Sequence, residues 1–331
     1  MLFDLLLTIM GLAVLLGGGD LLVRGASALA QRLGVSPLMI GITVVAFGTS
    51  APELAVNVTA AWRDRGEISF GNIFGSNMAN IGLIVALGAL LRPIQIKSQV
   101  VSREVPMMLL ATAVAAVLAL DGLLSQRADL FDRGDGITLV LLFSVFVYYT
   151  VNDVLRQRSD SLLRESRVRV RDEESLHPVG SLGLATSTVY VAIGLAGLIL
   201  GAEFTVDGAV GLARDFGVSE AIIGLSIVAV GTSLPELMAT LVATWRDESD
   251  LAIGNVVGSN IFNLLLVLGV SAAIRPVEVP ARGLLDVAMV GILSCLLWLA
   301  SASRGNVIIR AEAALLLALY VAYLGWRTAG A

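Results

Sequence analysis

An internal repeat limits the possible folds of this chain more than any other property of its sequence. The second half repeats the first at a constant offset of 183 residues, and between Gly41 and Asp64 the ungapped identity is 13 of 24 positions. The same offset aligns AFGTSAPE, Ala46 to Glu53, with AVGTSLPE, Ala229 to Glu236. Chance does not produce such a match, so the chain is a duplication of one structural unit.

Long apolar segments recur in both halves, and each approaches the roughly 20 residues that a membrane-spanning helix needs. Of the 331 residues, 56% are hydrophobic and 15% are charged, a balance outside the range of soluble globular proteins. The first segment begins at Leu2 and continues past Leu16 without a cleavage pattern, so we interpret it as a retained helix rather than a signal peptide. With about ten such segments, we expect an all-α integral membrane protein with ten transmembrane helices.

The repeat also predicts the domain organisation. The first five-helix unit covers residues 1–155, a charged linker covers residues 156–180, and the second five-helix unit covers residues 181–331. Because five is odd, the second unit enters the membrane from the opposite side. We therefore expect two inverted repeats with broken helices at the midplane. The linker is too short and too poor in apolar residues to bury a core of its own.

The basic residues predict an orientation. With the amino terminus outside, 14 of the 22 lysines and arginines lie on the inner side, six of them in the linker, and 8 lie on the outer side. Inner loops of membrane proteins carry such an excess. We expect a multi-pass protein of the plasma membrane with an extracellular amino terminus and a cytoplasmic central loop.

Each copy of the repeated motif carries a glutamate inside an apolar helix. Glu53 and Glu236 would lie near the hydrocarbon centre, where a carboxylate costs at least a few kcal/mol unless it is neutralised. Pro52 and Pro235 precede them, and each proline removes a backbone N–H and clashes with the carbonyl four residues back, which breaks or kinks the helix. Opened backbone at membrane depth is tolerated where it faces a polar cavity, so both breaks point to a binding site.

Further oxygen atoms are predicted to face the same cavity, because helical spacing aligns the hydroxyls of each GTS motif with its glutamate and places a polar stripe on the following helix. The candidate metal ligands are the side chains of Glu53, Glu236, Thr49, Ser50, Thr232, Ser233, Ser76, Asn80, Ser259 and Asn263, with the backbone carbonyls of Ala46 and Ala229. A set made only of oxygen suits a hard cation, and Ca²⁺ accepts about six to eight oxygens in flexible geometry.

Each candidate also has a purely structural interpretation. The glutamates would then be buried acids bonded to a neighbouring hydroxyl, the hydroxyls would bond back to their own helices, and the asparagines would join neighbouring helices. A packing role fits Asn72, Asn77, Asn255 and Asn260 as well as a binding role does. Asp20 and Arg24 are four residues apart, a spacing that predicts an ion pair on one helix face.

Charge balance indicates what such a site would do. Two carboxylates offset one Ca²⁺ or two Na⁺, so the two loads compete for the same oxygens, and competition at a shared site is exchange. A Ca²⁺/H⁺ antiporter that uses the glutamates as proton carriers and a passive cation channel remain as alternatives. The chain has one cysteine, Cys295, and one histidine, His177, which argues against disulfide, zinc and histidine-based chemistry. We expect no enzyme activity, no cofactor, no nucleic acid and no obligatory protein partner.

These motifs resemble those of the sodium/calcium exchangers in the cation/Ca²⁺ exchanger superfamily, including prokaryotic members without a regulatory domain. The resemblance rests on GTSAPE with GNIFGSN in the first half and GTSLPE with GNVVGSN in the second. It implies ten transmembrane helices, Na⁺ and Ca²⁺ as transported ions, and cation ligands at the candidate residues above. Some relatives carry an aspartate late in the second repeat where this chain has Asn263, which argues against K⁺ cotransport and leaves two core carboxylates.

Overall fold

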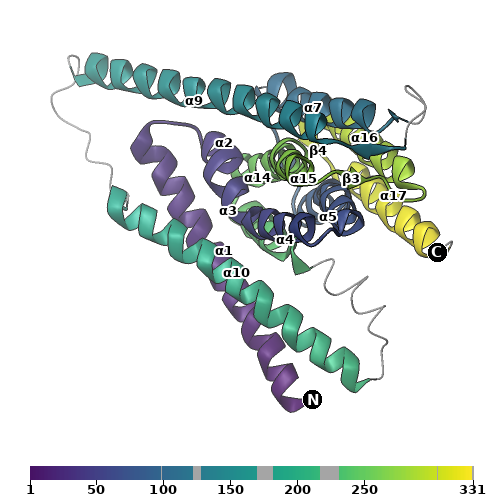
Figure 1. Cartoon of the computed structure of the whole chain (residues 1–331). Helices are drawn as coiled ribbons and strands as arrows, with labels where there is room; N and C mark the ends of the chain where they lie inside the picture. The colour runs from purple at the N-terminus through teal and green to yellow at the C-terminus, as the bar shows by residue number, and fades with distance from the viewer. Residues whose placement is uncertain (98, 122–127, 170–181, 217–230, 304, 330–331) are drawn as a thin grey trace.

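The protein, described here from a computed structural model, is built of helices with two short β-ribbons at their ends (Figure 1). The structure describes the chain apart from residues 98, 122–127, 170–181, 217–230, 304 and 330–331. The described elements of the first half are α1 (Leu2–Leu33), α2 (Pro37–Ile40), η1 (Gly41–Val45), α3 (Ala46–Thr49), α4 (Ala51–Trp62), α5 (Gly66–Ala79), η2 (Asn80–Val85), α6 (Ala86–Leu91), β1 (Ile94–Gln95), η3 (Val100–Glu104), α7 (Val105–Leu118), β2 (Leu130–Phe131) and α9 (Arg133–Arg169), where η denotes a π-helical segment. Those of the second half are α10 (Leu184–Asp215), α13 (Leu234–Trp245), α14 (Ser249–Ile261), η5 (Phe262–Val267), α15 (Leu268–Ile274), β3 (Val277–Glu278), α16 (Gly283–Ala302), β4 (Val307–Ile308) and α17 (Arg310–Ala329).

Membrane-spanning length and apolar composition are found in several of these helices. Among the described residues, seven helices are long and apolar enough to cross a bilayer, or eight when one bent pair counts as a span. The seven are Leu2–Leu33, Gly66–Leu91, Val100–Leu118, Arg133–Ser159, Leu184–Asp215, Ser249–Ile274 and Gly283–Ala302. The expectation of an all-helical, multi-pass membrane protein is confirmed. The total of ten stays a prediction, because α13 follows residues outside the described ranges and α17 is not in this set.

Helix ends follow residues that the sequence supplies in matching places of the two halves. Asp64 and Asp247 take positive φ angles of 59° and 65° directly after α4 and α13, a conformation that aspartate tolerates better than most residues. Proline follows both Arg92 and Arg275 where α6 and α15 end, and the residue before a proline is driven out of the helical conformation.

The helix that carries the first GTS motif is broken where the sequence predicts. The pair Pro37–Thr49 and Ala51–Trp62 is bent by 44°, and Ser50 lies in the break with φ −86° and ψ 3°. Pro52 falls in the first turn of α4, where its missing N–H needs no partner. The second copy has the same local geometry, since Ser233 has φ −91° and ψ 3° before α13.

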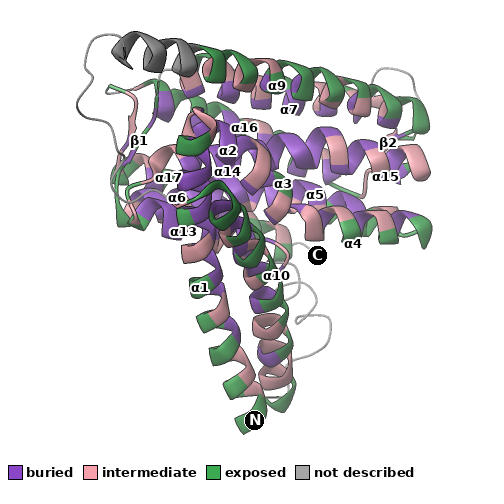
Figure 2. Cartoon of the chain, turned by 90° about the vertical axis from the view of Figure 1, so that its left-hand side faces the viewer, coloured by how far each residue is buried: buried purple, intermediate pink, exposed green. Residues whose placement is uncertain are grey.

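Two long helices stand apart from the rest. Each of α1 and α10 has 32 residues, and they lie against each other as a pair that extends beyond the other helices, with much of its outer surface exposed (Figures 1 and 2). Glycines seven residues apart line their contact, at Gly11, Gly18 and Gly25 on α1 and Gly194, Gly201 and Gly208 on α10. A Cβ atom on Gly18 would lie 2.8 Å from the backbone nitrogen of Leu198, so the close approach requires glycine.

The most buried helices lie at the centre of the remaining bundle (Figure 2). In α14, every residue from Leu251 to Ile261 is buried, and the two segments Gly66–Leu91 and Ser249–Ile274 are each 78% buried in their most apolar window. These are the two helices that carry the predicted polar stripes. The stripes therefore face protein rather than lipid.

The two halves are joined reciprocally at their ends. Strand β1 pairs with β4, and β2 pairs with β3, so each antiparallel ribbon contains one strand from each half. Arg92 forms an ion pair with Asp247 at 2.9 Å, and Arg275 forms one with Asp64. The offset of 183 residues converts one of these pairs into the other.

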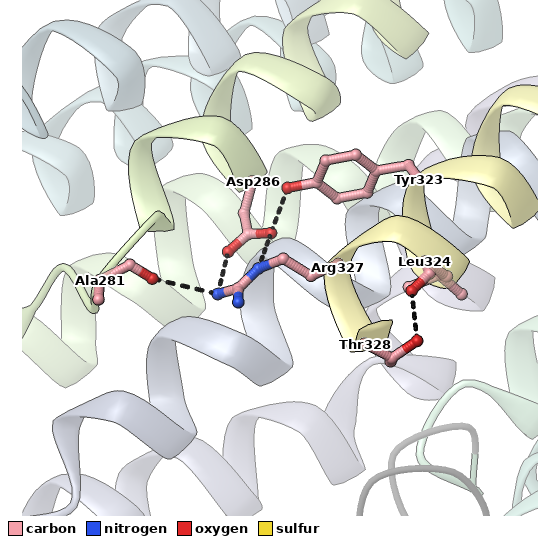
Figure 3. Close-up of polar contacts among 6 residues, drawn as sticks. All are labelled: Ala281, Asp286, Tyr323, Leu324, Arg327 and Thr328. Carbon is pink, nitrogen blue, oxygen red and sulfur yellow. Dashed lines mark hydrogen bonds and ion pairs between the residues drawn. The ribbon is translucent and has the colours of Figure 1, made fainter. Parts of the chain in front are cut away.

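A further ion pair fastens the last two helices together (Figure 3). Asp286 of α16 accepts hydrogen bonds from the hydroxyl of Tyr323 at 2.5 Å and from Arg327 of α17 at 3.3 Å. In the first half, Arg103 of η3 pairs with Asp153 of α9. Arg103 and Asp286 are equivalent positions, so the contact recurs with its charges exchanged.

Candidate functional site

The two repeated glutamates occupy matching places at the helix breaks. Glu53 lies in the first turn of α4 and Glu236 in the first turn of α13, and each is only 1% exposed. The amino-terminal end of a helix favours negative charge. Neither carboxylate forms an ion pair with a lysine or arginine in the described part of the chain. Both acids are therefore buried without a protein cation to neutralise them.

A direct hydrogen bond joins the two broken helices. The hydroxyl of Ser50 donates to Oε1 of Glu236 at 3.0 Å. Next to it, the hydroxyl of Thr49 lies 3.1 Å from Oδ1 of Asn255 and 3.3 Å from the carbonyl oxygen of Ala46. The structure thus brings the first GTS motif against the second glutamate, as the repeat predicts.

Asn72 and Asn255 form equivalent links across the two halves. Nδ2 of Asn72 donates to the hydroxyl of Thr232 at 3.3 Å, which mirrors the contact of Asn255 with Thr49. Nδ2 of Asn255 also lies 3.4 Å from the carbonyl of Glu236. The packing interpretation of these two asparagines is therefore supported, and each one holds a predicted ligand hydroxyl.

Two contributors were not identified from the sequence. Asn57 donates to the carbonyl of Glu53 at 2.7 Å and to Oδ1 of Asn72 at 2.7 Å. Its partner at the constant offset, Thr240, accepts from Asn255 at 3.0 Å. Both residues are fully buried and lie four positions after a glutamate, a helical spacing that would have indicated the same face.

The helices after each break carry the second set of candidates. Ser76 receives a hydrogen bond from Ser233 at 3.2 Å, and Nδ2 of Asn263 donates to Oδ1 of Asn77 at 3.2 Å. The π-helical segments η2 and η5 begin at Asn80 and Phe262. Such segments shift the side chains that follow and are frequent at functional sites.

Several buried polar atoms of this region lack a hydrogen-bond partner among the described residues. They are Oε2 of Glu53, Oε2 of Glu236, both amide atoms of Asn80, Oγ of Ser259 and Oδ1 of Asn263. A buried polar atom without a partner costs about 1–3 kcal/mol. Five of the six are oxygens, which are the donor atoms that a hard cation takes.

The remaining candidates are accounted for as follows. Thr232 is half-buried, and Ala229 lies outside the described residues. No group of three or more histidine, cysteine, aspartate or glutamate side chains comes together within the described ranges, so the two glutamates and the neutral oxygens constitute the candidate site. The predicted pair of Asp20 and Arg24 forms at 2.9 Å, and the site does not include it.

Comparison with known sequences agrees with this arrangement. A family model described as sodium/calcium exchanger protein matches residues 3–152 and 186–329. The chain is 38% identical over 326 residues to the putative antiporter CaxA of Alkalimonas amylolytica, with 98% of each chain covered. It is 33% identical over 340 residues to the sodium/calcium exchanger MaX1 of Methanosarcina acetivorans, with 97% of each covered.

Solved structures show the same similarity in three dimensions. The sodium-calcium exchanger NCX_Mj soaked with zero Na⁺ and Ca²⁺ superposes with a TM-score of 0.82 at 32% identity, which covers 98% of this chain and 99% of that one. The same exchanger soaked with 2.5 mM Na⁺ and 0.1 mM Ca²⁺ gives a TM-score of 0.81 and 98% coverage of both. This chain therefore belongs to the sodium/calcium exchanger protein family.

Proposed function

We propose that this protein is an antiporter that exchanges Na⁺ for Ca²⁺ across the membrane at one site shared by its two halves. Membership of the family supports transport, and specifically cation/Ca²⁺ antiport, rather than an enzyme reaction. The observation that carries the proposal is the hydrogen bond from Ser50 to Glu236 at 3.0 Å. It joins the two repeated motifs, so one cation between them would reach oxygens of both.

The chemistry of the site fits the two ions. Two buried carboxylates balance one Ca²⁺ or two Na⁺, and in a cavity of low dielectric the loads are near-equivalent in charge. The unpartnered oxygens of Glu53, Glu236, Asn80, Ser259 and Asn263 are hard donors that both cations accept. A load that neutralises the acids would also satisfy these oxygens, which gives the loaded state its stability.

We further propose that alternating access arises from ten helices in two inverted repeats. Five predicted spans precede the linker, and each β-ribbon contains one strand from each half. The exchangeable ion pairs Arg92 with Asp247 and Arg275 with Asp64 are related by the same offset. An inverted repeat allows the two halves to exchange conformations around a fixed central site.

The same reasoning extends to orientation. The ion pair of Arg92 with Asp247 lies on the side predicted to be cytoplasmic, and that of Arg275 with Asp64 on the side predicted to be extracellular. Each pair joins residues that the basic-residue distribution assigns to one face. This agreement supports an extracellular amino terminus, a cytoplasmic central loop and a location in the plasma membrane.

Ion flux in vesicles tests the proposed exchange. The purified full chain is reconstituted, the vesicles are loaded with Na⁺, and ⁴⁵Ca²⁺ uptake is measured at clamped pH and clamped voltage. We expect uptake to follow the outward Na⁺ gradient and to stop when K⁺ replaces Na⁺ inside.

Two other results would reject Na⁺ coupling. Uptake that follows an imposed pH gradient and ignores Na⁺ would identify a Ca²⁺/H⁺ antiporter that uses the same carboxylates. Uptake that needs no counter-ion on the opposite side would identify a passive cation channel.

A further inference from the structure

A second polar cavity lies where the α1–α10 pair meets the rest of the protein. Its volume is about 390 Å³, and its polar lining comes from Arg24, Ser27 and Gln31 of α1, Tyr190 of α10, and Arg246 and Glu248 between α13 and α14. None of the candidate cation ligands lines it. This cavity is therefore separate from the proposed exchange site.

One wall of the cavity carries excess positive charge. Arg24 contacts Asp20 at 2.9 Å and Arg246 contacts the same carboxylate at 2.6 Å. Two guanidinium groups thus share one carboxylate, which leaves one positive charge. Arg24 and Arg246 are 53% and 30% exposed, so N–H groups of both remain accessible to an anion, and arginine binds phosphate oxygens well.

The other wall supplies a negative charge and a hydroxyl. Glu248 forms no ion pair within the described ranges. Ser27 is 9% exposed, and its hydroxyl oxygen has no hydrogen-bond partner among the described residues. A ligand that suits the whole cavity therefore carries a single negative charge near the arginines and a single positive charge near the glutamate.

We propose that this cavity binds the head group of a zwitterionic aminophospholipid. The phosphodiester lies against Arg24 and Arg246, and the primary ammonium lies against Glu248. The adjacent Trp245 is 77% exposed, and exposed tryptophans mark the head-group level of a bilayer. On α10, Ile193 is 53% exposed one turn beyond Tyr190, which provides an apolar surface for an acyl chain.

The internal repeat shows that the fold itself does not require this set of charges. The offset of 183 residues pairs Arg246 with Arg63, but it pairs Arg24 with Asp207, Ser27 with Val210 and Glu248 with Arg65. The other half builds the same helices with the charges at two of these places reversed. The head-group site thus belongs to one membrane face.

Native mass spectrometry of the purified full chain in detergent tests the proposal. The probes are phosphatidylethanolamine, phosphatidylcholine and phosphatidylglycerol with identical acyl chains. We expect phosphatidylethanolamine to be retained about fivefold better than phosphatidylcholine, because a quaternary ammonium cannot donate hydrogen bonds to Glu248.

Glu248→Gln provides the sharpest variant, since this side chain has no ion pair to lose within the described residues. It is expected to abolish the preference for phosphatidylethanolamine and to increase retention of phosphatidylglycerol, whose phosphodiester no longer meets a carboxylate. Arg65→Gln alters the equivalent position in the other half and should leave the lipid preference unchanged. Arg246→Gln should lower retention of phosphatidylethanolamine and phosphatidylcholine alike.

The proposal is overturned if wild-type protein retains phosphatidylethanolamine and phosphatidylcholine equally, or if Glu248→Gln keeps the preference. Displacement of the lipid by an excess of inorganic phosphate would show that the cavity takes a free anion instead. Because no ion flux is measured, these outcomes are independent of the proposed exchange of Na⁺ for Ca²⁺.

Discussion

Glu53 and Glu236 are the two side chains on which the proposed exchange depends most directly. Replacing either with glutamine keeps the volume but removes one of two buried charges, so Ca²⁺ loses half of its compensating charge. Loss of one partner from a buried charge pair costs about 2–5 kcal/mol, or at least about 30-fold. We expect Glu53→Gln and Glu236→Gln each to reduce Na⁺-driven ⁴⁵Ca²⁺ uptake by at least that factor.

Glu104 offers a matched control for this loss. It is also 1% exposed, but it lies in η3 beside Arg103 and outside the candidate site. Glu104→Gln is expected to retain uptake, and all three variants should elute as single species in gel filtration. Uptake at the wild-type rate in Glu53→Gln or Glu236→Gln would refute the assigned site.

The asparagines beside the glutamates hold the hydroxyls in place. Asn255→Ala removes the acceptor of Thr49 and the donor to Thr240, a change worth about 1–2 kcal/mol. We expect the Ca²⁺ concentration for half-maximal uptake to rise about 5- to 30-fold, with a smaller change in maximal rate. Asn72→Ala should act similarly through Thr232. A lower melting temperature with unchanged half-saturation would mean that these asparagines only stabilise the fold.

The sequence could predict which polar residues gather but not how they bond to one another. Helical spacing placed Ser50 and Glu53 on one face, and the repeat placed Glu236 opposite. The partner of Ser50 could not be deduced, because the contact depends on how two broken helices approach each other. The roles of Asn57 and Thr240 were missed for the same reason, since an isolated polar residue in an apolar helix gives no indication of its partner.

Helices were predicted more completely than their internal irregularities. The spans expected at Leu2 to Arg32 and at Gly136 to Asp153 correspond to α1 and to part of α9, and Pro52 correctly indicated a break. The π-helical segments η1, η2, η3 and η5 were not predicted. A π turn differs from an α turn by one residue in its hydrogen-bond register, and the same apolar residues satisfy both.

The contact between α1 and α10 gives a test at neighbouring positions. A Cβ atom on Gly18 would meet backbone atoms of α10 at 2.8–2.9 Å, whereas one on Gly17 would meet nothing within 4 Å. Overpacking a close contact costs about 1–3 kcal/mol, so Gly18→Ala should lower the melting temperature measured by scanning fluorimetry. Gly17→Ala should leave it unchanged or raise it, because alanine favours a helix over glycine by up to about 1 kcal/mol. Equal effects of the two substitutions would contradict this packing.

The connections between the halves serve geometry more than stability. Arg92 and Arg275 are each 51% exposed, and their partners Asp247 and Asp64 are each 65% exposed, and such surface ion pairs contribute about 0–1 kcal/mol. Their significance lies in their reciprocity, because each pair takes one residue from each half. The two ribbons have the same property. The halves are therefore interlocked at both ends and cannot be separated as independent domains.

The inverted arrangement makes a prediction about the two equivalent tryptophans that a parallel duplication would not make. Trp62 and Trp245 occupy matching positions and are 72% and 77% exposed, so each is accessible from one face of the membrane. In a chain with Cys295→Ser, we expect Trp62→Cys to react with a membrane-impermeant maleimide in intact cells. Trp245→Cys should react only after the membrane is opened, because an odd number of spans separates the two positions. Labelling of both from outside would reject the inverted repeat, and labelling of Trp245→Cys alone would reverse the proposed orientation while keeping the repeat.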